Sequence, residues 1–402
     1  MTGADPTGTP PEPRTLVIAN PSSDVYGSDL QMLESVTAMV ERGWKVIVTT
    51  PDDGPLVPLL TERGAEVQRV DYPVVRRENT SLRGFLRLAV DTVTALPRVC
   101  RAIRAVDPTV IYVNTVTIPL WVLAGRLMRR PVVCHVHEAE AQDRRLVRFA
   151  LNAPLVMASR LIVISQASMK ALTDVIPMLG RRAVIIYNGV PGPDVPPSPP
   201  TTNGPRRLAI IGRLSPRKGT DVALETLARL RAAGRDVVLE VCGTAFAGYE
   251  WYVEELKARS DKPDIRGAVH FSGYVRPVWS VLDRCEVVLA PSLREPFGNV
   301  VVEAQLAGRP VVAAAAMGHL ETVEDGVTGL LVEPGNPESM AAAVGRLLDE
   351  PDLASDLARR AREQSVEHFA PGHYGQRIAE LLSDPSGEGR RRGQASRRRR
   401  SG

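Results

Sequence analysis

The stretch VVLAPSLREPFGNVVVEAQLAG, residues 287–308, encodes a strand, a tight turn and a helix in direct succession. The opening run of apolar residues predicts a buried strand, and the Pro-Phe-Gly sequence predicts the turn. Asn299 is a favourable N-cap, so we expect a helix from about Asn299 to Gly308. A strand that leads through a turn into a helix is the repeating unit of parallel α/β folds.

The same turn has the features of a binding site. Uncapped amide groups in the first turn of a helix attract phosphate. Glu303 lies one turn into the expected helix, roughly 6 Å along its axis, which is about the reach from a bound diphosphate to a ribose hydroxyl pair. Glu295, before the turn, could accept hydrogen bonds from a sugar on the other side of the phosphates. The stretch predicts a sugar-nucleotide site, although a surface loop with two solvated glutamates would also fit the stretch taken alone.

The rest of the chain repeats this strand–helix pattern. Continuous apolar runs predict strands covered on both faces, and their alternation with helical patterns predicts parallel sheets. A segment with seven prolines, residues 191–205, forms a linker between two such series. We therefore expect two doubly wound Rossmann-like domains facing across a cleft, residues 15–190 and 206–371, with ligands at the carboxyl ends of strands. The expected strands are Leu16–Ala19, Val46–Thr50, Val67–Val70, Val110–Asn114, Val132–His137, Leu161–Ser165, Val184–Tyr187, Leu208–Leu214, Val237–Cys242, Val269–Gly273, Val287–Pro291, Val311–Ala314 and Gly329–Val332.

The first strand of the second domain ends at a basic turn. Gly212 and Arg213 lie near the end of that strand, and the turn that follows contains Lys218. An arginine can grip two oxygens of a diphosphate and a lysine can add a point charge, each charge-assisted bond contributing roughly 1.5–3 kcal/mol. Arg213 and Lys218 are thus candidate diphosphate ligands, with a solvated basic turn as the alternative.

Two loops of the first domain bring polar residues to strand ends. His137 and Glu138 follow a buried strand, at the lip where sites form in such sheets, although a lone histidine at a strand end often has a structural role. Gly27, Ser28 and Asp29 lie in the loop after the first strand. Gly27 gives this loop a flexible position, Ser28 can cap the next helix, and Asp29 could receive an acceptor hydroxyl.

Composition limits the class of protein. A length of 402 residues suits two or three domains, and 44% apolar with 24% charged residues is typical of a soluble protein. Four widely spaced cysteines without a Cys-x-x-Cys motif favour reduced thiols in a cytoplasmic protein. Residues 1–14 hold four prolines and no apolar run, so we expect a disordered tail and no signal peptide. No apolar run reaches the length of about 18 residues that a membrane span needs.

The basic residues are unevenly distributed. The formal net charge is +4, but Ser386–Gly402 alone contributes seven arginines and one glutamate, which leaves the rest of the chain at about −2. This tail, residues 386–402, is expected to be disordered and could attract a membrane or contact nucleic acid nonspecifically. Aromatic residues make up only 4% of the chain, so base-stacking platforms and a specific nucleic-acid partner are not expected.

Leu82–Val106 has apolar residues at helical spacing and a basic face, and Pro97 should bend or divide the helix. The face could be solvated, or it could dock on an anionic membrane surface. Its arginines fall within roughly 120° of a helical wheel: Arg83, Arg87, Arg98, Arg101 and Arg104.

The spacing Glu-x7-Glu around Pro-Phe-Gly resembles the signature of the retaining glycosyltransferases of the GT-B fold, family 4 (glycosyl transferases group 1). The resemblance runs over about residues 15–382. In that family the first glutamate contacts the donor sugar and the second contacts the ribose, and these roles would fall on Glu295 and Glu303. The family also has a histidine beside the donor sugar, which His137 matches, where it could bond a sugar hydroxyl or steady positive charge at C1. A final helix, residues 372–383, would pack back onto the first domain.

The resemblance completes the set of candidate site residues. The expected catalytic residues are His137, Arg213, Lys218 and Glu295. The expected acceptor residues are Ser28, Asp29 and Glu138. The expected donor-binding residues are Gly27, Gly212, Arg213, Lys218, Gly243, Tyr274, Glu295, Phe297, Gly298, Asn299, Val300, Glu303 and Gly318.

The resemblance implies transfer of a hexose-type sugar from a nucleotide diphosphate to a hydroxyl of a glycan or lipid-linked saccharide, with retention of configuration. No Asp-x-Asp motif occurs in the chain, so we expect no metal requirement and no cofactor. A sugar-nucleotide dehydrogenase or epimerase would need Gly-x-Gly-x-x-Gly after a first strand, and neither first strand is followed by one. A noncatalytic nucleic-acid or membrane binder would need a basic stripe on the folded core.

Overall fold

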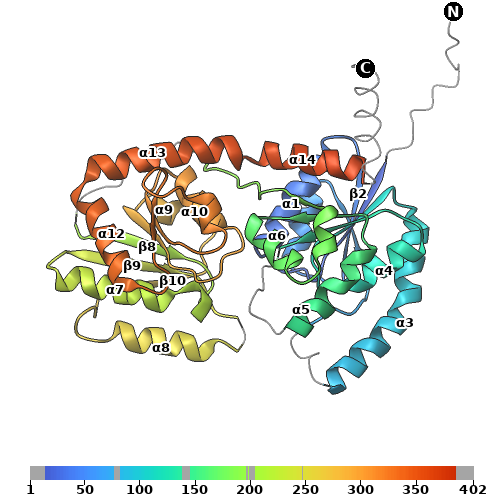
Figure 1. Cartoon of the computed structure of the whole chain (residues 1–402), viewed down its shortest axis with the longest axis horizontal. Coiled ribbons are helices and arrows are strands. Elements are labelled where there is room, and N and C mark those ends of the chain that lie inside the picture. The colour runs from blue at the N-terminus through green and yellow to red at the C-terminus, as the bar shows by residue number, and fades with distance from the viewer. Residues whose placement is uncertain are drawn as a thin grey trace, which may run out of the picture. The chain divides into compact units, whose positions relative to one another are not determined.

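The computed structural model describes residues 14–76, 82–137, 145–195, 198, 204–246 and 248–385 (Figure 1). Contacts divide the chain into two compact units. Unit 1 comprises Met1–Val163, Leu172–Ile186 and Gly375–Gly402, and unit 2 comprises Ile164–Ala171 and Tyr187–Tyr374. Both expected tails, apart from Arg14, lie outside the described residues, as do residues 196–197 and 199–203 of the expected linker.

Unit 1 is built on a parallel sheet of seven described strands in the order β3-β2-β1-β4-β5-β6-β7. The strand order reverses between β1 and β4, which pair directly from Leu16 with Val110 to Ala19 with Val113. Its elements are β1 (Thr15–Ala19), α1 (Gly27–Val40), β2 (Lys45–Thr50), α2 (Leu56–Glu62), β3 (Glu66–Arg69), α3 (Leu82–Val106), β4 (Val110–Val113), α4 (Pro119–Leu127), β5 (Val132–Val136), α5 (Arg145–Asn152), η2 (Ala153–Met157), β6 (Arg160–Val163), α6 (Gln166–Thr173, whose first part groups with unit 2), η3 (Pro177–Arg181) and β7 (Ala183–Ile185).

Unit 2 has a second parallel sheet, with six described strands in the order β10-β9-β8-β11-β12-β13. Here the order reverses between β8 and β11, so this is the point where a doubly wound sheet opens a crevice for ligands. Its elements are β8 (Arg206–Ile211), η4 (Pro216–Lys218), α7 (Thr220–Ala232), β9 (Val237–Cys242), α8 (Glu250–Ser260), β10 (Val269–Gly273), α9 (Trp279–Leu282), β11 (Val287–Ala290), α10 (Asn299–Leu306), β12 (Val311–Ala314), α11 (His319–Thr322), β13 (Leu330–Val332), α12 (Pro337–Asp349), α13 (Pro351–His368) and α14 (Pro371–Ser383, which continues into unit 1).

The central strands of unit 2 bury both faces, as their continuous apolar sequence predicts. In β11, Val287 and Leu289 pack into a core with α7, α8 and α12. Val288 and Ala290 point to the other face and pack with residues of α9 and α10. The sheet therefore forms the middle layer of unit 2, and its strand ends are left to build a site.

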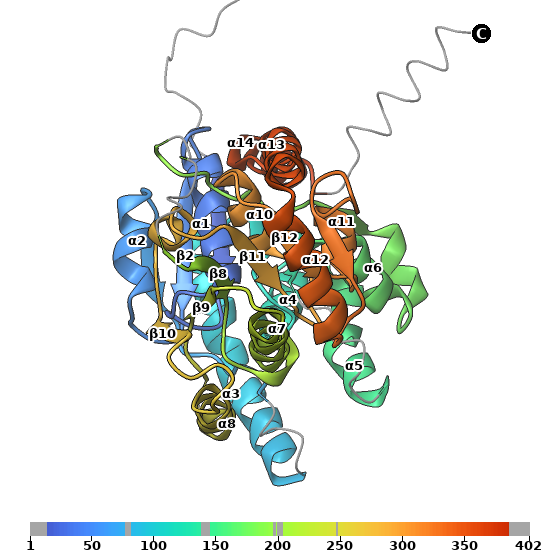
Figure 2. The same ribbon diagram turned by 90° about the vertical axis from the view of Figure 1, so that its left-hand side faces the viewer.

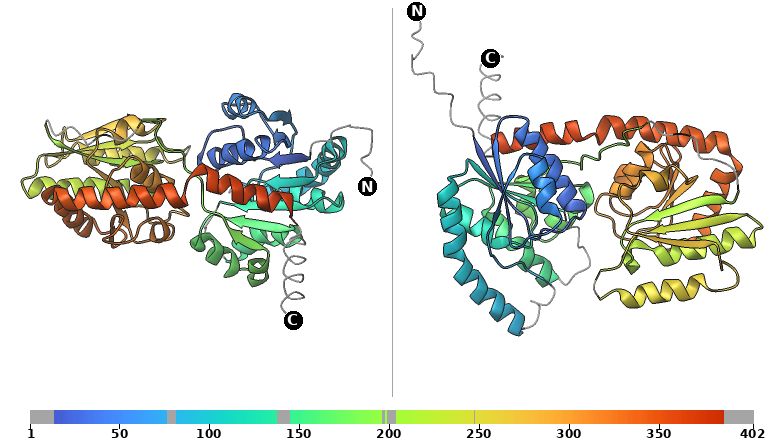
Figure 3. Two further views of the ribbon diagram at one scale, coloured as in Figure 1. Left: turned by 90° about the horizontal axis from the view of Figure 1, so that it is seen from above. Right: turned by 180° about the vertical axis from the view of Figure 1, so that it is seen from behind.

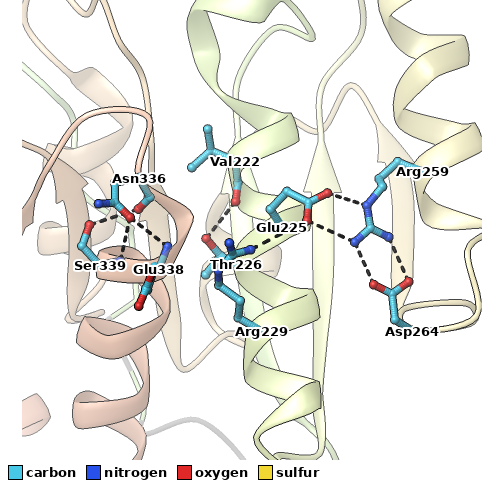
Figure 4. Close-up of polar contacts among 9 residues, drawn as sticks. All are labelled: Val222, Glu225, Thr226, Arg229, Arg259, Asp264, Asn336, Glu338 and Ser339. Carbon is cyan, nitrogen blue, oxygen red and sulfur yellow. Dashed lines mark hydrogen bonds and ion pairs between the residues drawn. The ribbon is translucent and has the colours of Figure 1, made fainter.

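Polar contacts stabilise the helices of unit 2 (Figure 4). Arg259 on α8 lies between Glu225 on α7 and Asp264 in the loop after α8, and binds both carboxylates. The Oδ1 atom of Asn336 accepts hydrogen bonds of 3.0 Å from the amides of Glu338 and Ser339, which caps α12. Such a cap contributes about 1 kcal/mol.

The final helix groups with both units, the division falling between Tyr374 and Gly375. Within unit 1, Gly375 of α14 lies against α1, because a Cβ atom at this glycine would stand 2.9 Å from the Cβ of Ala38. Only a glycine allows the two helices to approach this closely.

The α/β fold class predicted from the sequence is confirmed, and each expected strand coincides with an observed one to within three residues at either end. Two local expectations need correction: Asn299 as the N-cap of its helix, and a division of the long helix at Pro97. The N-cap of α10 is Gly298 in the left-handed region, with φ of 106°, and Asn299 is the first helical residue. Pro97 does not divide α3, which is continuous from Leu82 to Val106. Within the described ranges, no helix is both long and apolar enough to cross a lipid bilayer.

Candidate active site

Three strands of unit 2 meet in direct main-chain contact at their carboxyl ends. The amide of Gly212 donates to the carbonyl of Cys242 at 2.9 Å, and the amide of Gly243 donates to the carbonyl of Gly273 at 2.7 Å. Gly243 has φ of 149°, and a Cβ atom on it would stand 1.7 Å from the carbonyl oxygen of Gly212. A glycine at position 243 is thus needed for the strand ends to meet, and the adjoining Gly212 and Cys242 line one wall of a cavity.

The cavity lies at the reversal point between β8 and β11. Its wall combines strand ends, the basic turn and the start of α10. The lining residues are Ile210, Ile211, Gly212, Arg213, Leu214, Lys218, Thr220, Val241, Cys242, Leu289, Ala290, Pro291, Ser292, Glu295, Gly298, Val300, Val301 and His319. The structure therefore brings Gly212, Arg213, Lys218, Glu295, Gly298 and Val300 of the predicted donor site together.

Lys218 and Glu295 form an ion pair inside this cavity. Burial alone would raise the pKa of the Glu295 carboxyl, but the positive potential of Lys218 and His319 and the hydrogen bond from Lys218 lower it below its ordinary value. Glu295 is therefore ionised at neutral pH. A bound diphosphate would compete with Glu295 for Lys218, which leaves the carboxylate free to accept hydroxyl hydrogen bonds.

His319 is a site residue that sequence reasoning missed. It is almost fully buried, and its Nδ1 lies 3.1 Å from the carbonyl oxygen of Ala314, so Nδ1 carries the proton. Burial lowers the pKa of His319, while the nearby Glu295 carboxylate opposes that effect. The opposite edge of the ring faces Gly298, where a Cβ would lie 3.1 Å from the ring carbon Cδ2. Its signal in the sequence was its place shortly after the predicted strand Val311–Ala314, and in the structure it is the first residue of α11.

The start of α10 offers unpaired amide donors. The amides of Val301 and Val302 donate to the carbonyl of Gly298. Among the described residues, nothing accepts a hydrogen bond from the amides of Asn299 or Val300. Since the positive end of the helix dipole lies at the same place, this turn is suited to a phosphate group.

Two further residues frame this region. The guanidinium of Arg213 lies over the ring of Phe246, with Cζ 3.6 Å from the ring centre. This cation–π contact orients Arg213, and Phe246 is a second residue that sequence reasoning missed. The side chain of Asn299 is held by Asn188, whose Nδ2 donates to Oδ1 of Asn299 at 2.8 Å.

Glu303 lies further along α10 and is half-buried. Burial raises the pKa of its carboxyl to about 7, which the positive charge of Arg276 only partly offsets. In the unliganded protein Glu303 is therefore partly protonated at neutral pH. Its ionisation state differs from that of Glu295, although both glutamates belong to the same sequence motif.

Three expected donor residues occupy other environments. The Phe297 ring is buried in an apolar cluster, 5.8 Å from the ring of Tyr187 and 5.3 Å from that of Phe369. Gly318 is packed against the backbone of Phe297, where a Cβ would stand 2.5 Å away. Both residues therefore support the loop, and neither lines the cavity at the β8–β11 reversal. Tyr274 follows the end of β10 and is mostly exposed, so it is not a core residue.

In unit 1, the reversal point carries a network of buried amides. Asn20 follows β1 and Asn114 follows β4, 94 residues apart in the chain, and Nδ2 of Asn114 donates to Oδ1 of Asn20 at 2.8 Å. His137, just after β5, lies 2.9 Å from Oδ1 of Asn114 through Nε2, so Nε2 is the protonated nitrogen. Neither asparagine was among the residues predicted from the sequence.

His137 is held in its neutral form. Burial lowers its pKa to about 3, because the charged ring would lose its hydration. Its ring also lies against that of His135, with 3.9 Å between ring centres. His135 is fully buried, beside the Tyr112 hydroxyl, and burial and the neighbouring His137 hold its pKa well below the usual value. At neutral pH His137 can therefore act as a hydrogen-bond donor or dipole, but not as a cation.

The loop before α1 differs from expectation. Asp29 is buried, and its two oxygens accept hydrogen bonds from Nδ2 of Asn20 at 2.8 Å and from the amide of Tyr26 at 2.9 Å. The N-cap of α1 is therefore Tyr26 and not Ser28, and Asp29 stabilises this cap from the third position of the helix. Gly27 is the first residue of α1 and is exposed, while Ser28 is half-buried. Glu138 lies outside the described residues.

Across the described ranges, no group of three or more His, Cys, Asp or Glu side chains is arranged to hold a metal ion. The polar groups found at the two strand-order reversals are instead amides, cations and single carboxylates.

Two family models match the chain. The model "Glycosyl transferases group 1" matches residues 195–364, which covers β8 to most of α13. The model "Glycosyl transferase 4-like domain" matches residues 27–189, which covers most of unit 1. The cavity residues of unit 2 all lie within the first match, and His137 and Asn114 lie within the second.

Sequence relatives point the same way. Glycogen synthase of Mycobacterium tuberculosis is 31% identical over 225 residues, which covers 55% of this chain and 53% of that protein. Alpha-D-kanosaminyltransferase of Streptomyces kanamyceticus is 30% identical over 176 residues, covering 43% of this chain and 44% of that protein. D-inositol 3-phosphate glycosyltransferase of Acidothermus cellulolyticus is 33% identical over 184 residues, covering 44% and 39%. The chain thus spans about half the length, or less, of these curated relatives.

A solved structure shares the fold over nearly the whole chain. Anabaena HepE in complex with UDP and glucose superposes with a TM-score of 0.79 at 24% identity, covering 92% of this chain and 99% of that one. The fold and the two family matches agree, and the chain belongs to the glycosyltransferases, with a group 1 region at residues 195–364 and a 4-like domain at residues 27–189.

Proposed function

We propose that the chain transfers a hexose-type sugar from a nucleotide diphosphate to a hydroxyl of a glycan or a lipid-linked saccharide. The observation that carries this proposal is the cavity at the β8–β11 reversal, which is lined by the Lys218–Glu295 ion pair and by Val300 at the start of α10. A cation and a helix N-terminus recognise a diphosphate, and a carboxylate beside them recognises sugar hydroxyls.

The leaving group is the main place where these residues act. As the bond from C1 to the diphosphate breaks, negative charge grows on the diphosphate and the sugar becomes oxocarbenium-like. Preorganised positive groups stabilise that charge without rearrangement, and Lys218, Arg213 and the start of α10 supply them. We propose that these positive groups replace the metal ion that other glycosyl transfer sites use, so that the reaction proceeds without divalent metal.

We further propose retention of configuration through attack on the same face as the departing phosphate, which then serves as the base. Neutral His137 would contribute a hydrogen bond or dipole beside the sugar. A trapped covalent glycosyl-enzyme adduct would overturn this part of the proposal.

The relatives suggest which donors to try first. HepE, which is 24% identical in sequence to this chain, has been crystallised with UDP-glucose. UDP-glucose is therefore the first donor to test, beside GDP- and dTDP-sugars. We place the reaction in the cytoplasm, where nucleotide sugars are made, and docking on the inner face of a membrane would bring the enzyme to a lipid-linked acceptor.

Calorimetric titration with UDP in EDTA, followed by nucleotide release from UDP-glucose, tests the core of the proposal. We expect binding and slow hydrolysis in EDTA, loss of hydrolysis in Lys218→Ala, and weaker UDP binding in Glu303→Ala. The neighbouring exposed cation gives the matched control, Arg217→Ala, which should retain both. If the whole panel of nucleotide sugars fails to bind, or if binding survives unchanged in Lys218→Ala, the proposed site is wrong. Activity that requires added Mg²⁺ or Mn²⁺ would refute metal independence alone.

A further inference from the structure

The first half of α3 is not packed into unit 1. From Arg83 to Thr94, no residue with a described side chain is buried. Burial begins at the next residue, Ala95, and continues with Val99 and Ile103, which face the fold. Figures 1 and 2 show this cyan helix extending beyond the rest of unit 1, and the right-hand view of Figure 3 shows the same from behind.

This unpacked half carries an apolar stripe. Leu86, Val90 and Val93 are 56%, 62% and 71% exposed. Their spacing of four and then three residues places them on one side of the helix. Exposure of valine and leucine side chains to water is unfavourable. A stripe of them along one side of a helix therefore indicates a surface that binds a partner.

A second helix adds to the same kind of surface. No residue of α5 is buried, and Leu146 and Phe149 are 82% and 52% exposed. They are three residues apart and so share one side of α5. In Figures 1 and 2, α5 lies on the same lower side of unit 1 as the free half of α3.

The charges beside these apolar residues are almost all positive. Arg83 and Arg87 lie on the free half of α3, and Arg145 and Arg148 lie on α5. Asp91 is the acidic residue on the free half of α3. Its Oδ2 lies 3.8 Å from Nε of Arg87, and an ion pair this exposed contributes little to stability. Within the described part of these two segments, four cations stand against one anion.

We propose that the free half of α3, together with α5, docks the protein on an anionic lipid bilayer. The apolar side chains of Leu86, Val90, Val93, Leu146 and Phe149 enter the region between headgroups and acyl chains. The arginines beside them meet lipid phosphates or carboxylates, as in other interfacial amphipathic helices. This proposal does not depend on glycosyl transfer.

The positive charge of this surface distinguishes three candidate partners: a second copy of the chain, an uncharged lipid surface and an anionic bilayer. If a second copy of the chain covered this surface, a symmetric contact would bring Arg83, Arg87, Arg145 and Arg148 against the same residues of the other copy. An uncharged lipid surface would supply no net negative charge to the arginines. An anionic bilayer satisfies both the apolar stripe and the cations.

Flotation of the full chain with vesicles tests the proposal. Vesicles of phosphatidylcholine alone and of phosphatidylcholine with phosphatidylglycerol should separate weak from strong binding, with the strong binding reduced by salt. Each arginine near such a surface contributes about fivefold in affinity, so Arg83→Gln with Arg87→Gln should weaken binding roughly 10- to 30-fold. Val90→Asp with Val93→Asp should weaken it by at least about tenfold, since the carboxylates face lipid.

Val366→Asp is the matched control, because Val366 of α13 is 49% exposed and has no place in the proposed surface. All variants keep residues 386–402, so attraction by that segment is held constant. The substituted positions are exposed, and we expect the thermal midpoints of all variants to match that of the unmodified protein.

Three results would contradict the proposal. The first is binding to anionic vesicles that Val90→Asp with Val93→Asp leaves unchanged. The second is equal binding to vesicles with and without phosphatidylglycerol. The third is a dimer in light scattering that the same double variant converts to a monomer, which would assign the surface to a second copy of the chain.

Discussion

Lys218 and Glu295, 77 residues apart in the chain, form an ion pair in which each side chain is only 17% exposed. One lies in the turn after β8 and the other in the loop after β11, so the pair links the two strands between which the order of the sheet reverses. The pair thus has a structural role in the free protein as well as the proposed role in donor binding.

Removing one partner should cost stability as well as function. We expect Lys218→Met and Glu295→Gln each to lower the free energy of unfolding by about 1–3 kcal/mol, because each leaves a buried polar partner unsatisfied. The double variant should lose less than the sum of the two, since the unsatisfied group is then gone. Urea unfolding of the four proteins measures this coupling. Strict additivity would show that the two side chains do not interact in solution.

The two glutamates of the motif should affect stability with opposite dependence on pH. The folded-state pKa of Glu303 is raised to about 7, so the folded protein holds a proton there between pH 4.5 and 7 that the unfolded chain has released. Its carboxyl therefore makes folding less favourable as pH rises through that window, by on the order of 2–3 kcal/mol. Glu303→Gln should accordingly be more stable than the unmodified protein at pH 8 and equal to it at pH 4.

Glu295 provides the opposite case within the same protein. Its folded-state pKa is lowered, so the stability it contributes is present above its unfolded pKa and is lost as pH falls through the folded value. Glu295→Gln should therefore be less stable than the unmodified protein at neutral pH, with the difference shrinking in acid. If both variants shift stability in the same direction at pH 8, the assigned ionisation states are incorrect.

Close contact between strand ends makes Gly243 intolerant of a side chain. Gly243→Ala would force a Cβ to within 1.7 Å of the Gly212 carbonyl oxygen, so the strands must separate. We expect a loss of more than about 4 kcal/mol or failure to fold, together with loss of UDP binding. Gly234→Ala is the control, because Gly234 also has positive φ, at 80°, but nothing lies within 4 Å of its Cβ position. That variant should lose only about 1 kcal/mol.

Asp29 should behave as a structural residue. Asp29→Ala removes the acceptor for the Tyr26 amide and for the Asn20 side chain, so we expect a loss of about 1–2 kcal/mol in unfolding free energy. Ser28→Ala, one residue earlier, should change stability by less than about 0.5 kcal/mol. Thermal unfolding compares them. A stable Asp29→Ala variant that has lost only its affinity for acceptors would restore the role first expected for this residue.

Much of the fold could be read from the sequence because its signals are local. The run Val287–Ala290 is continuously apolar, which favours a strand covered on both faces, and the structure buries both of its faces. The basic turn at Lys218 and the glutamate at 295 were recognisable for a similar reason. Each follows a strand directly, so its place at the carboxyl end of the sheet follows from the chain order.

The residues that were missed depend on contacts between distant parts of the chain. Asn20 and Asn114 become partners only because β1 and β4 pair, and nothing local marks either asparagine. Phe297 stands inside the recognised motif, yet its ring turns toward Phe369 and Tyr187. Periodicity cannot indicate where a side chain points in a turn or in the first turn of a helix, which explains why Phe297 and Asp29 were assigned to binding.

The unsatisfied amides at the start of α10 have a practical consequence for anyone handling the protein. Together with the ammonium of Lys218, they are expected to bind small inorganic dianions. Sulfate in a precipitant or phosphate in a storage solution would occupy the place of the substrate and raise the apparent KM for the donor. Kinetic work should therefore begin in chloride with an amine buffer.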